Sequence, residues 1–330
     1  MVDIYGTLGP KCSAKEILVS MFDAGMTGVR LNLSHITLHH AAQQIETLQA
    51  AARECGKTAQ LLIDMQGPEL RIGALEKPIA LKDGETAVLG KKGIPVPELV
   101  LPVLVPGQKV LLDDGKILLT VLSADKAEVE ARVLRGGMLS SRKSIALPGA
   151  EMHTPTMTET DRENISIAGQ YGVTAVMQPF VRDRKDLETV RAALNDAGSS
   201  DIQLFAKIEN MEGVSNLDDL IPACDEIVIA RGDLGNAMPL WELPRVQKNI
   251  SVKCRCAQKK FMVVTQMLAS MEHNAVPTRA EVSDIFNAVC DGAASVMVTG
   301  ETAVGEHPVE AIRYLANTVR EAQAYLEGRC

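Results

Sequence analysis

The chain has 330 residues, of which 46% are hydrophobic and 23% are charged, close to ordinary globular usage. This composition excludes a disordered chain, a collagen-like fibre and a small disulfide-rich scaffold. A net charge of −8 and an aromatic content of 3% argue against a nucleic-acid binder, which relies on basic patches or stacking platforms.

The first part of the chain alternates short apolar runs with amphipathic stretches. We predict strands at Ile4–Leu8, Gly28–Leu33 and Thr58–Asp64, with helices over 14–24 and 38–54 between them. From about 72 to 147 the pattern changes to short β-type runs broken by glycine and proline. Because no long helical period is found there, this segment predicts a small all-β insertion.

The alternation of strands and helices returns after the insertion. Strands are predicted at Thr174–Met177, Ile202–Ile208, Glu226–Ala230, Phe261–Thr265 and Ala294–Val298, and helices over about 158–170, 184–196, 213–221, 241–258, 279–291 and 308–326. This makes eight strands, each followed by a helix, which implies parallel strands with helical crossovers. Removing the 76 residues of 72–147 from 330 leaves 254, near the roughly 250 typical of a (β/α)8 barrel.

The predicted fold class is therefore α/β, a (β/α)8 TIM barrel with an inserted all-β domain. Residues 1–71 and 148–330 are expected to form the barrel, and 72–147 the insertion. No window approaches 18 uninterrupted apolar residues and the first residues lack a signal-peptide pattern, so neither a membrane span nor secretion is expected. Seven scattered cysteines favour reduced thiols and a cytoplasmic location.

Active sites of such barrels lie at the C-terminal ends of the strands. The polar residues predicted there are Arg30, Asn32, Ser34, Asp64, Lys207, Glu209, Asp233 and Thr265. Carboxylates without clustered histidine or cysteine suit Mg²⁺ or Mn²⁺ rather than zinc, and arginine and lysine beside them suit a phosphate. The residues alone thus predict a metal-dependent enzyme acting on an anionic, phosphorylated substrate. The P-loop motif is absent from the sequence.

Ten short segments follow one another along nearly the whole chain. They are GTLGP, RLNLSH, DMQGPELRIG, LLDDGKI, the stretch around ALPG, KIENMEGVSNLDDLI, ARGDLG, TQMLASM, PTRAEVSD and TGETAVGEHP. In this order they resemble the pyruvate kinase family. The resemblance implies a barrel domain A with a β-rich lid, domain B, inserted after the third strand. It also implies transfer of phosphate from phosphoenolpyruvate to ADP, giving pyruvate and ATP in glycolysis.

The resemblance implies a role for each matching residue at the substrate. Lys207 would contact the transferring phosphoryl group, and Arg30 would bind phosphate. The backbone amides of Gly232 and Asp233, with Thr265, would bind the substrate carboxylate. Thr265 also matches the position where a water-relayed proton reaches the enolate in the family.

The resemblance also implies cation and nucleotide sites. Glu209 and Asp233 would hold the divalent metal, Mg²⁺ or Mn²⁺. A potassium site would be formed by Asn32, Ser34, Asp64 and Met65, and K⁺ is expected because Glu69 matches the potassium-requiring branch. The nucleotide phosphates would contact Asn32, His35 and Arg71.

Some positions depart from the family pattern. A chain ending at Cys330 is not expected to carry the family's C-terminal regulatory domain, so we predict a homodimer through the barrel interface around Pro277–Glu281, unresponsive to sugar bisphosphates. Pro179 replaces a serine, and Thr160 replaces a lysine near the nucleotide. These changes leave open a non-catalytic or regulatory homologue that binds phosphoenolpyruvate or nucleotide, and a related reaction with a changed acceptor.

Overall fold

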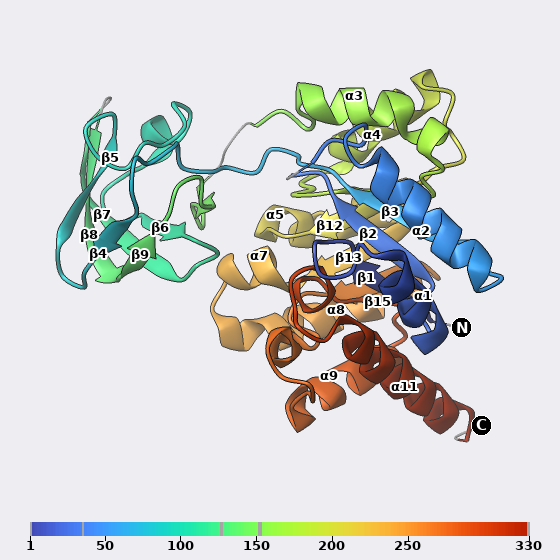
Figure 1. Cartoon of the computed structure of the whole chain (residues 1–330). Helices are drawn as coiled ribbons and strands as arrows, with labels where there is room; N and C mark the ends of the chain where they lie inside the picture. The colour runs from blue at the N-terminus through green and yellow to red at the C-terminus, as the bar shows by residue number, and fades with distance from the viewer. Residues whose placement is uncertain (1, 35, 126–127, 151–153, 329–330) are drawn as a thin grey trace. The chain divides into compact units, whose positions relative to one another are not determined.

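The computed structural model describes residues 2–34, 36–125, 128–150 and 154–328. The chain forms two compact units. Unit 1 comprises Met1–Gly67, Thr156–Leu234 and Leu243–Cys330, and unit 2 comprises Pro68–Pro155 and Gly235–Glu242. Figure 1 labels the main helices and strands of both units.

The described residues of unit 1 form a closed barrel of eight parallel strands, which confirms the predicted fold class. In chain order the strands are β1 (Asp3–Thr7), β2 (Gly28–Asn32), β3 (Gln60–Asp64), β11 (Ala175–Gln178), β12 (Gln203–Ile208), β13 (Glu226–Ala230), β14 (Lys260–Val264) and β15 (Ser295–Met297). The first strand closes the barrel, because β1 pairs with β15 on one side and with β2 on the other. The predicted strand ends agree with the observed ones to within two residues.

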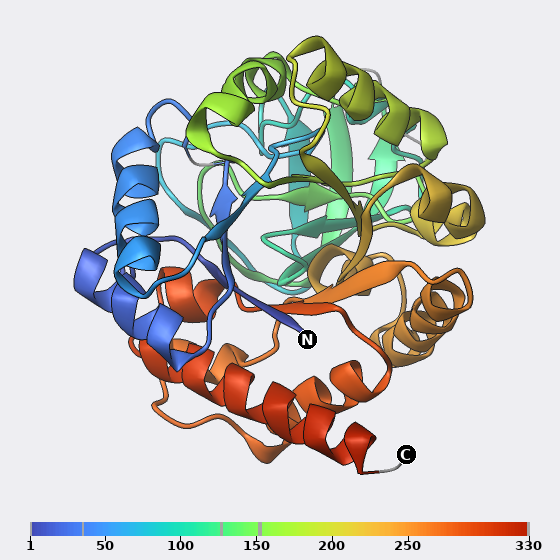
Figure 2. The ribbon, with the colours of Figure 1, turned by 90° about the vertical axis from the view of Figure 1, so that its right-hand side faces the viewer.

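Helices follow the strands and surround the barrel (Figure 2). They are α1 (Lys15–Ala24), α2 (Ala42–Glu54), α3 (Glu159–Ile167), α4 (Arg184–Asp196), α5 (Met211–Ser215), α6 (Leu217–Leu220), α7 (Arg231–Asn236), α8 (Leu243–Cys256), α9 (Arg279–Cys290), α10 (Gly300–Ala303) and α11 (Pro308–Glu327). The single helix predicted over 213–221 is instead divided at Asn216, whose side chain donates to the Arg182 carbonyl at 3.0 Å. No described helix is long and apolar enough to cross a membrane.

Capping residues fix where several of these helices begin. Thr158 and Asp161 form a capping box at α3, and Thr278 and Glu281 form another at α9. In each box the threonine hydroxyl accepts from a backbone N–H that the helix leaves unpaired, and the acidic side chain accepts from the threonine backbone. The polar sequence before each helix therefore determines its start.

The inward face of the barrel changes character along its length. The apolar middle is a cluster that includes Tyr5, Leu62 and Phe205. Because side chains alternate across a strand, residues two positions further along face the interior as well, such as Asp64 after Leu62 and Lys207 after Phe205. The barrel interior is therefore apolar in the middle and polar towards the strand ends.

Unit 2 has its own sheets and core. Its strands are β4 (Ile79–Leu81), β5 (Thr86–Gly90), β6 (Lys109–Leu112), β7 (Ile117–Ala124), β8 (Glu128–Arg135), β9 (Gly137–Leu139) and β10 (Ile145–Ala146). The sheet of order β10-β6-β7-β8-β5 and the β4-β9 pair are antiparallel. Buried aliphatic side chains of these strands form one cluster. The β-rich character predicted for this segment is thus confirmed.

Candidate active site

Lys207 lies near the C-terminal end of β12, between two carboxylates. Its Nζ is 2.9 Å from Oε1 of Glu209 and 3.2 Å from Oδ2 of Asp64. The lysine side chain is 14% exposed, and each carboxylate is only 3% exposed. Burying an ammonium group without a partner costs desolvation free energy, and the two carboxylates compensate for this cost at Lys207.

Asp64 also binds Arg30, the other predicted phosphate-binding cation. Nε and Nη2 of Arg30 donate to Oδ2 of Asp64 at 2.8 and 2.6 Å, and Nη1 donates to Oγ1 of Thr7 at 3.4 Å. The two strands are neighbours in the barrel, with Arg30 opposite Leu62 and hence close to Asp64. Asp64 therefore joins two cations that the sequence places 177 residues apart, Arg30 and Lys207.

The charges in this cluster support one another. Burial acts to raise the pKa of Asp64, but the positive charges of Lys207 and Arg30 outweigh it and hold the pKa below its usual value. Burial acts to lower the pKa of Lys207, but Asp64 and Glu209 outweigh it and raise the pKa above its usual value. Lys207 is therefore a fixed positive charge at neutral pH, as stabilisation of a developing negative charge requires.

Glu209 and Asp233 follow neighbouring strands and offer oxygen ligands. Oε2 of Glu209 accepts from the backbone N–H of Phe180 at 2.9 Å. Asp233 lies in the first turn of α7, directly after β13. Among the described residues, no group of three or more histidine, cysteine or acidic side chains is placed to hold a metal. Mg²⁺ commonly takes one or two protein carboxylates and completes its shell with water and substrate oxygens, so this donor set fits Mg²⁺ or Mn²⁺.

Thr265 is held in a strained conformation just after β14. Its φ is +78°, a left-handed value that a β-branched residue rarely adopts. Nε and Nη2 of Arg231 donate to the Thr265 carbonyl at 3.1 and 2.7 Å, and Nη1 donates to Asp284 on α9 at 2.5 Å. A Cβ at Gly232 would lie 3.2 Å from Cγ2 of Thr265, so glycine permits this close approach. The predicted pair, Gly232 and Thr265, is thus adjacent.

The residues predicted for potassium lie at the ends of β2 and β3. Asn32 is opposite Asp64 in the strand register, and its Oδ1 accepts from the Ser34 N–H at 3.1 Å. Met65 follows Asp64 and donates its N–H to the Met177 carbonyl at 3.1 Å. Amide, hydroxyl, carboxylate and carbonyl oxygens are the ligands that a hard monovalent cation takes, so the residue types fit the prediction.

Two of the predicted nucleotide residues remain to be placed. His35 lies outside the described residues. Arg71 belongs to unit 2, where its Nη2 is 2.9 Å from Glu69 and its Nη1 donates to the Arg142 carbonyl at 3.1 Å. Their roles, and that of Glu69 in potassium dependence, stay predictions.

The departures from the family pattern are accommodated locally. Pro179 packs against Gly67, where a Cβ would overlap the proline ring. Thr160 lies in the first turn of α3, next to Asp161. The Asp161 carboxylate accepts from the backbone N–H groups of Gln66 and Gly67 at 2.9 and 3.0 Å, and so fixes the segment after β3.

Two positioning residues were not predicted from the sequence. One is Arg231, described above. The other is Glu301, which is 1% exposed and accepts from the backbone N–H groups of Leu268 and Thr299 at 3.1 and 2.6 Å. It joins the segments after β14 and β15. The only sequence signal for either residue was a charged side chain just beyond a buried strand.

Comparison with known proteins identifies close sequence relatives. A family model described as pyruvate kinase, barrel domain, matches residues 1–312. The chain is 38% identical to a pyruvate kinase of Geobacillus stearothermophilus, over 99% of this chain and 57% of that protein. It is 36% identical to one of Chlamydia pneumoniae, over 98% of this chain and 69% of that protein. It is 37% identical to one of Thermococcus litoralis, over 98% of this chain and 70% of that protein. The chain therefore spans little more than half the length of the Geobacillus relative.

Proposed function

Because the chain belongs to the pyruvate kinase family, we propose that it transfers the phosphoryl group of phosphoenolpyruvate to ADP, giving pyruvate and ATP. The observation that carries this proposal is the cluster of Arg30, Asp64, Lys207 and Glu209 at the C-terminal ends of the barrel strands β2, β3 and β12. It presents two mostly buried cations to an anionic substrate, each in an ion pair with a carboxylate.

In this proposal each residue acts on one part of the substrate. Lys207 neutralises charge on the transferring phosphoryl group, and Arg30 binds its oxygens. The backbone amides of Gly232 and Asp233 donate to the substrate carboxylate, together with the Thr265 hydroxyl. Positioned charge and fixed donors are the largest contributions in phosphoryl transfer, because little covalent chemistry is left to the protein.

The proposal includes two kinds of cation. Glu209 and Asp233 hold Mg²⁺ or Mn²⁺, which when bound supplies positive charge to the phosphoryl and enolate oxygens. K⁺ is held by Asn32, Ser34, Asp64 and the Met65 carbonyl. Oxygen donors and the lack of histidine and cysteine in this set support hard cations over zinc or copper.

The proposal also assigns the domains and the assembly. Residues 1–71 and 148–330 act as catalytic domain A, and 72–147 act as lid domain B. Arg71, His35 and Asn32 contact the nucleotide phosphates. The chain works in the cytoplasm as a homodimer through the barrel surface around Pro277–Glu281. Support for that surface comes from Val276, which is 60% exposed directly before it.

The experiment is a pyruvate-release assay with phosphoenolpyruvate, Mg²⁺ and a panel of nucleoside diphosphates, with and without K⁺. We expect release that requires the divalent metal and a diphosphate and that K⁺ increases. The same assay on Lys207→Met controls for contaminating activity. No diphosphate-dependent release above that variant would contradict the proposal.

A non-catalytic homologue that binds phosphoenolpyruvate is the second candidate. The observation favouring it is Thr160 in the first turn of α3, an uncharged residue at the position where the family has a lysine. Without that charge the nucleotide phosphates lose one partner. Saturable binding of phosphoenolpyruvate in calorimetry, together with no turnover on any diphosphate, would favour this candidate.

A further inference from the structure

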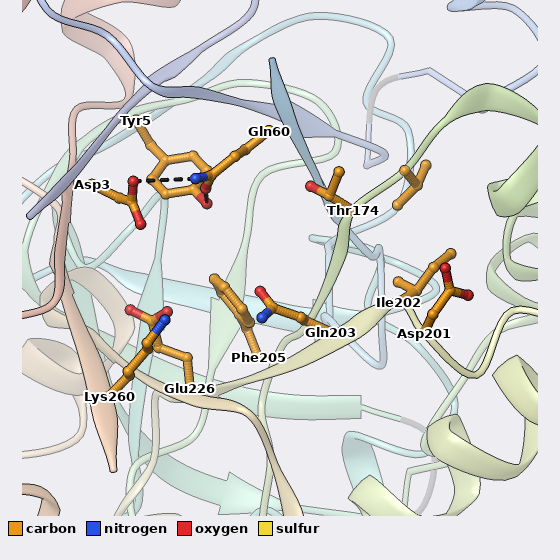
Figure 3. Close-up of a pocket in the computed structure, with 11 residues that line it drawn as sticks. Asp3, Tyr5, Gln60, Thr174, Asp201, Ile202, Gln203, Phe205, Glu226 and Lys260 are labelled. Atoms are coloured by element: carbon orange, nitrogen blue, oxygen red, sulfur yellow. Dashed lines mark hydrogen bonds between the residues drawn. The ribbon is translucent and has the colours of Figure 1, made fainter. Parts of the chain in front are cut away.

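A polar cavity of about 380 Å³ lies at the N-terminal end of the barrel, and Figure 3 shows the residues that line it. Five residues that line it are the first residues of their strands: Asp3 of β1, Gln60 of β3, Gln203 of β12, Glu226 of β13 and Lys260 of β14. All lining residues belong to unit 1. Its volume falls at the lower end of the range usual for small-molecule sites.

Aromatic rings and a hydrogen-bonded chain make part of the wall. Tyr5 and Phe205 are 3% and 2% exposed and belong to the barrel core. The Tyr5 hydroxyl donates to Oε1 of Gln60, whose Nε2 donates to Oδ1 of Asp3 at 3.1 Å. These contacts hold Gln60 and Asp3 in place, so the wall is preformed.

Glu226 is a carboxylate in this wall that lacks a full set of partners. The residue is 5% exposed, and Oε1 accepts from the Ser295 hydroxyl. Within the described part of the chain no group donates to its Oε2. Oε2 is not among the buried unpaired atoms of the described residues, so it is open to the cavity that Glu226 lines. A ligand with an N–H group that enters the cavity can therefore donate to it.

The charged residues that line the cavity favour a positively charged ligand. Three of them are acidic, Asp3, Asp201 and Glu226, and one is basic, Lys260. Figure 3 shows Asp201 on the other side of the cavity from Asp3 and Glu226. A metal ion is a poorer fit, because the described residues include no group of three acidic, histidine or cysteine side chains close enough to hold one. The faces of Tyr5 and Phe205 also attract organic cations.

We propose that this cavity binds a small aliphatic diammonium cation, with one ammonium group donating to Oε2 of Glu226 and the other facing Asp201. Each ammonium then meets a carboxylate at its end of the cavity. The alkyl chain between them packs on the aromatic wall. The site is separate from the proposed phosphoryl-transfer site and does not depend on it.

The ionisation of Glu226 gives the proposal a pH signature. Burial, with the charge of Asp3, raises the pKa of Glu226 to about 7, although the Ser295 hydroxyl and Lys260 act to lower it. A cation binds the ionised carboxylate, so below pH 7 binding must displace a proton. With a pKa near 7, the affinity at pH 6 is about tenfold weaker than at pH 8.

The test is calorimetric titration of the full chain with 1,4-diaminobutane dihydrochloride at pH 6 and pH 8, against KCl at equal ionic strength. We expect saturable 1:1 binding that is about tenfold tighter at pH 8. Glu226→Gln should weaken binding at pH 8 at least tenfold and remove the pH dependence. The matched control is Glu321→Gln on α11, an exposed carboxylate outside the cavity.

Three results would overturn the proposal: no saturable heat with the diamine, the same heat with KCl, or unchanged binding by Glu226→Gln. Circular dichroism is used to check that the Glu226→Gln variant is folded. Should it not fold, Asp201→Asn decides instead, because Asp201 is exposed and its loss leaves the interior intact. Unchanged affinity in that variant would likewise overturn the proposal. No readout here uses turnover, so the outcome is distinguishable from failure of the proposed function.

Discussion

Lys207→Met should separate catalysis from folding at the centre of the candidate site. The substitution keeps the length of the side chain but removes the charge that lies 2.9 Å from Glu209 and 3.2 Å from Asp64. Asp64 keeps Arg30 as a partner, and Glu209 keeps only the Phe180 N–H among the contacts described above. Breaking a buried pair costs about 3–5 kcal/mol, because one charge is left uncompensated. For a unit of this size we therefore expect a midpoint of thermal unfolding lower by about 5–15 °C.

The variant should lose turnover even at temperatures where it is fully folded, so its lower stability does not account for the loss. Removing one preorganised charge from phosphoryl transfer should lower turnover at least about a thousandfold, or about 4 kcal/mol. The assay is pyruvate release at saturating substrate and at a temperature where circular dichroism shows the variant folded. Lys253→Met serves as the control, because it removes a lysine from an exposed ion pair with Asp218 on the barrel surface. A folded Lys207→Met variant with turnover within tenfold of the unmodified chain would refute the assignment.

Four further results are expected. Glu209→Gln and Asp233→Asn should each weaken Mn²⁺ binding at least about tenfold in paramagnetic relaxation titrations, since a hard cation prefers ionised oxygen; unchanged affinity in both would remove the metal site. Arg231→Lys should lower kcat more than it raises KM, because one ammonium cannot replace two N–H donors to the Thr265 carbonyl while also reaching α9; a pure KM effect would contradict this. Asp64 has a lowered pKa in the folded chain, so its contribution to stability is complete above the ordinary aspartate pKa and is lost as the pH falls through the folded value. Asp64→Asn should therefore flatten the acid side of the stability profile in urea unfolding, and an unchanged profile would argue against the pairing. Light scattering should give a mass near two chains, and a mass near four would contradict the proposed homodimer.

The sequence allowed the main members of the candidate site to be predicted, because parallel strands bring their C-terminal ends to one edge. Arg30, Asp64 and Lys207 were recognisable from alternation and strand position alone, and the structure places them in one ion-paired cluster. Arg30 and Asp64 pair between the neighbouring strands β2 and β3, whereas Lys207 on β12 reaches Asp64 although β11 lies between their strands.

Other features required the structure because no local pattern encodes them. The left-handed backbone of Thr265 is unfavourable for threonine by itself, so only the contact with Arg231 and the neighbouring Gly232 accounts for it. Asp161 fixes a segment 94 residues earlier in the chain through two backbone hydrogen bonds. Glu226 begins an apolar strand, and its sequence neighbours do not reveal that it is buried beside a cavity.

Charge balance explains why a phosphate and a divalent metal belong together in the proposed site. Arg30, Lys207, Asp64 and Glu209 sum to zero when all four are ionised, and they are linked by ion pairs in a nearly dry environment. A phosphate dianion alone would add two negative charges beside Asp64 and Glu209, and a divalent cation alone would add two positive charges beside Lys207 and Arg30. Either imbalance is expensive at low dielectric, whereas the two added together leave the sum at zero. The balanced cluster therefore favours a substrate that brings a divalent cation over one that arrives without it.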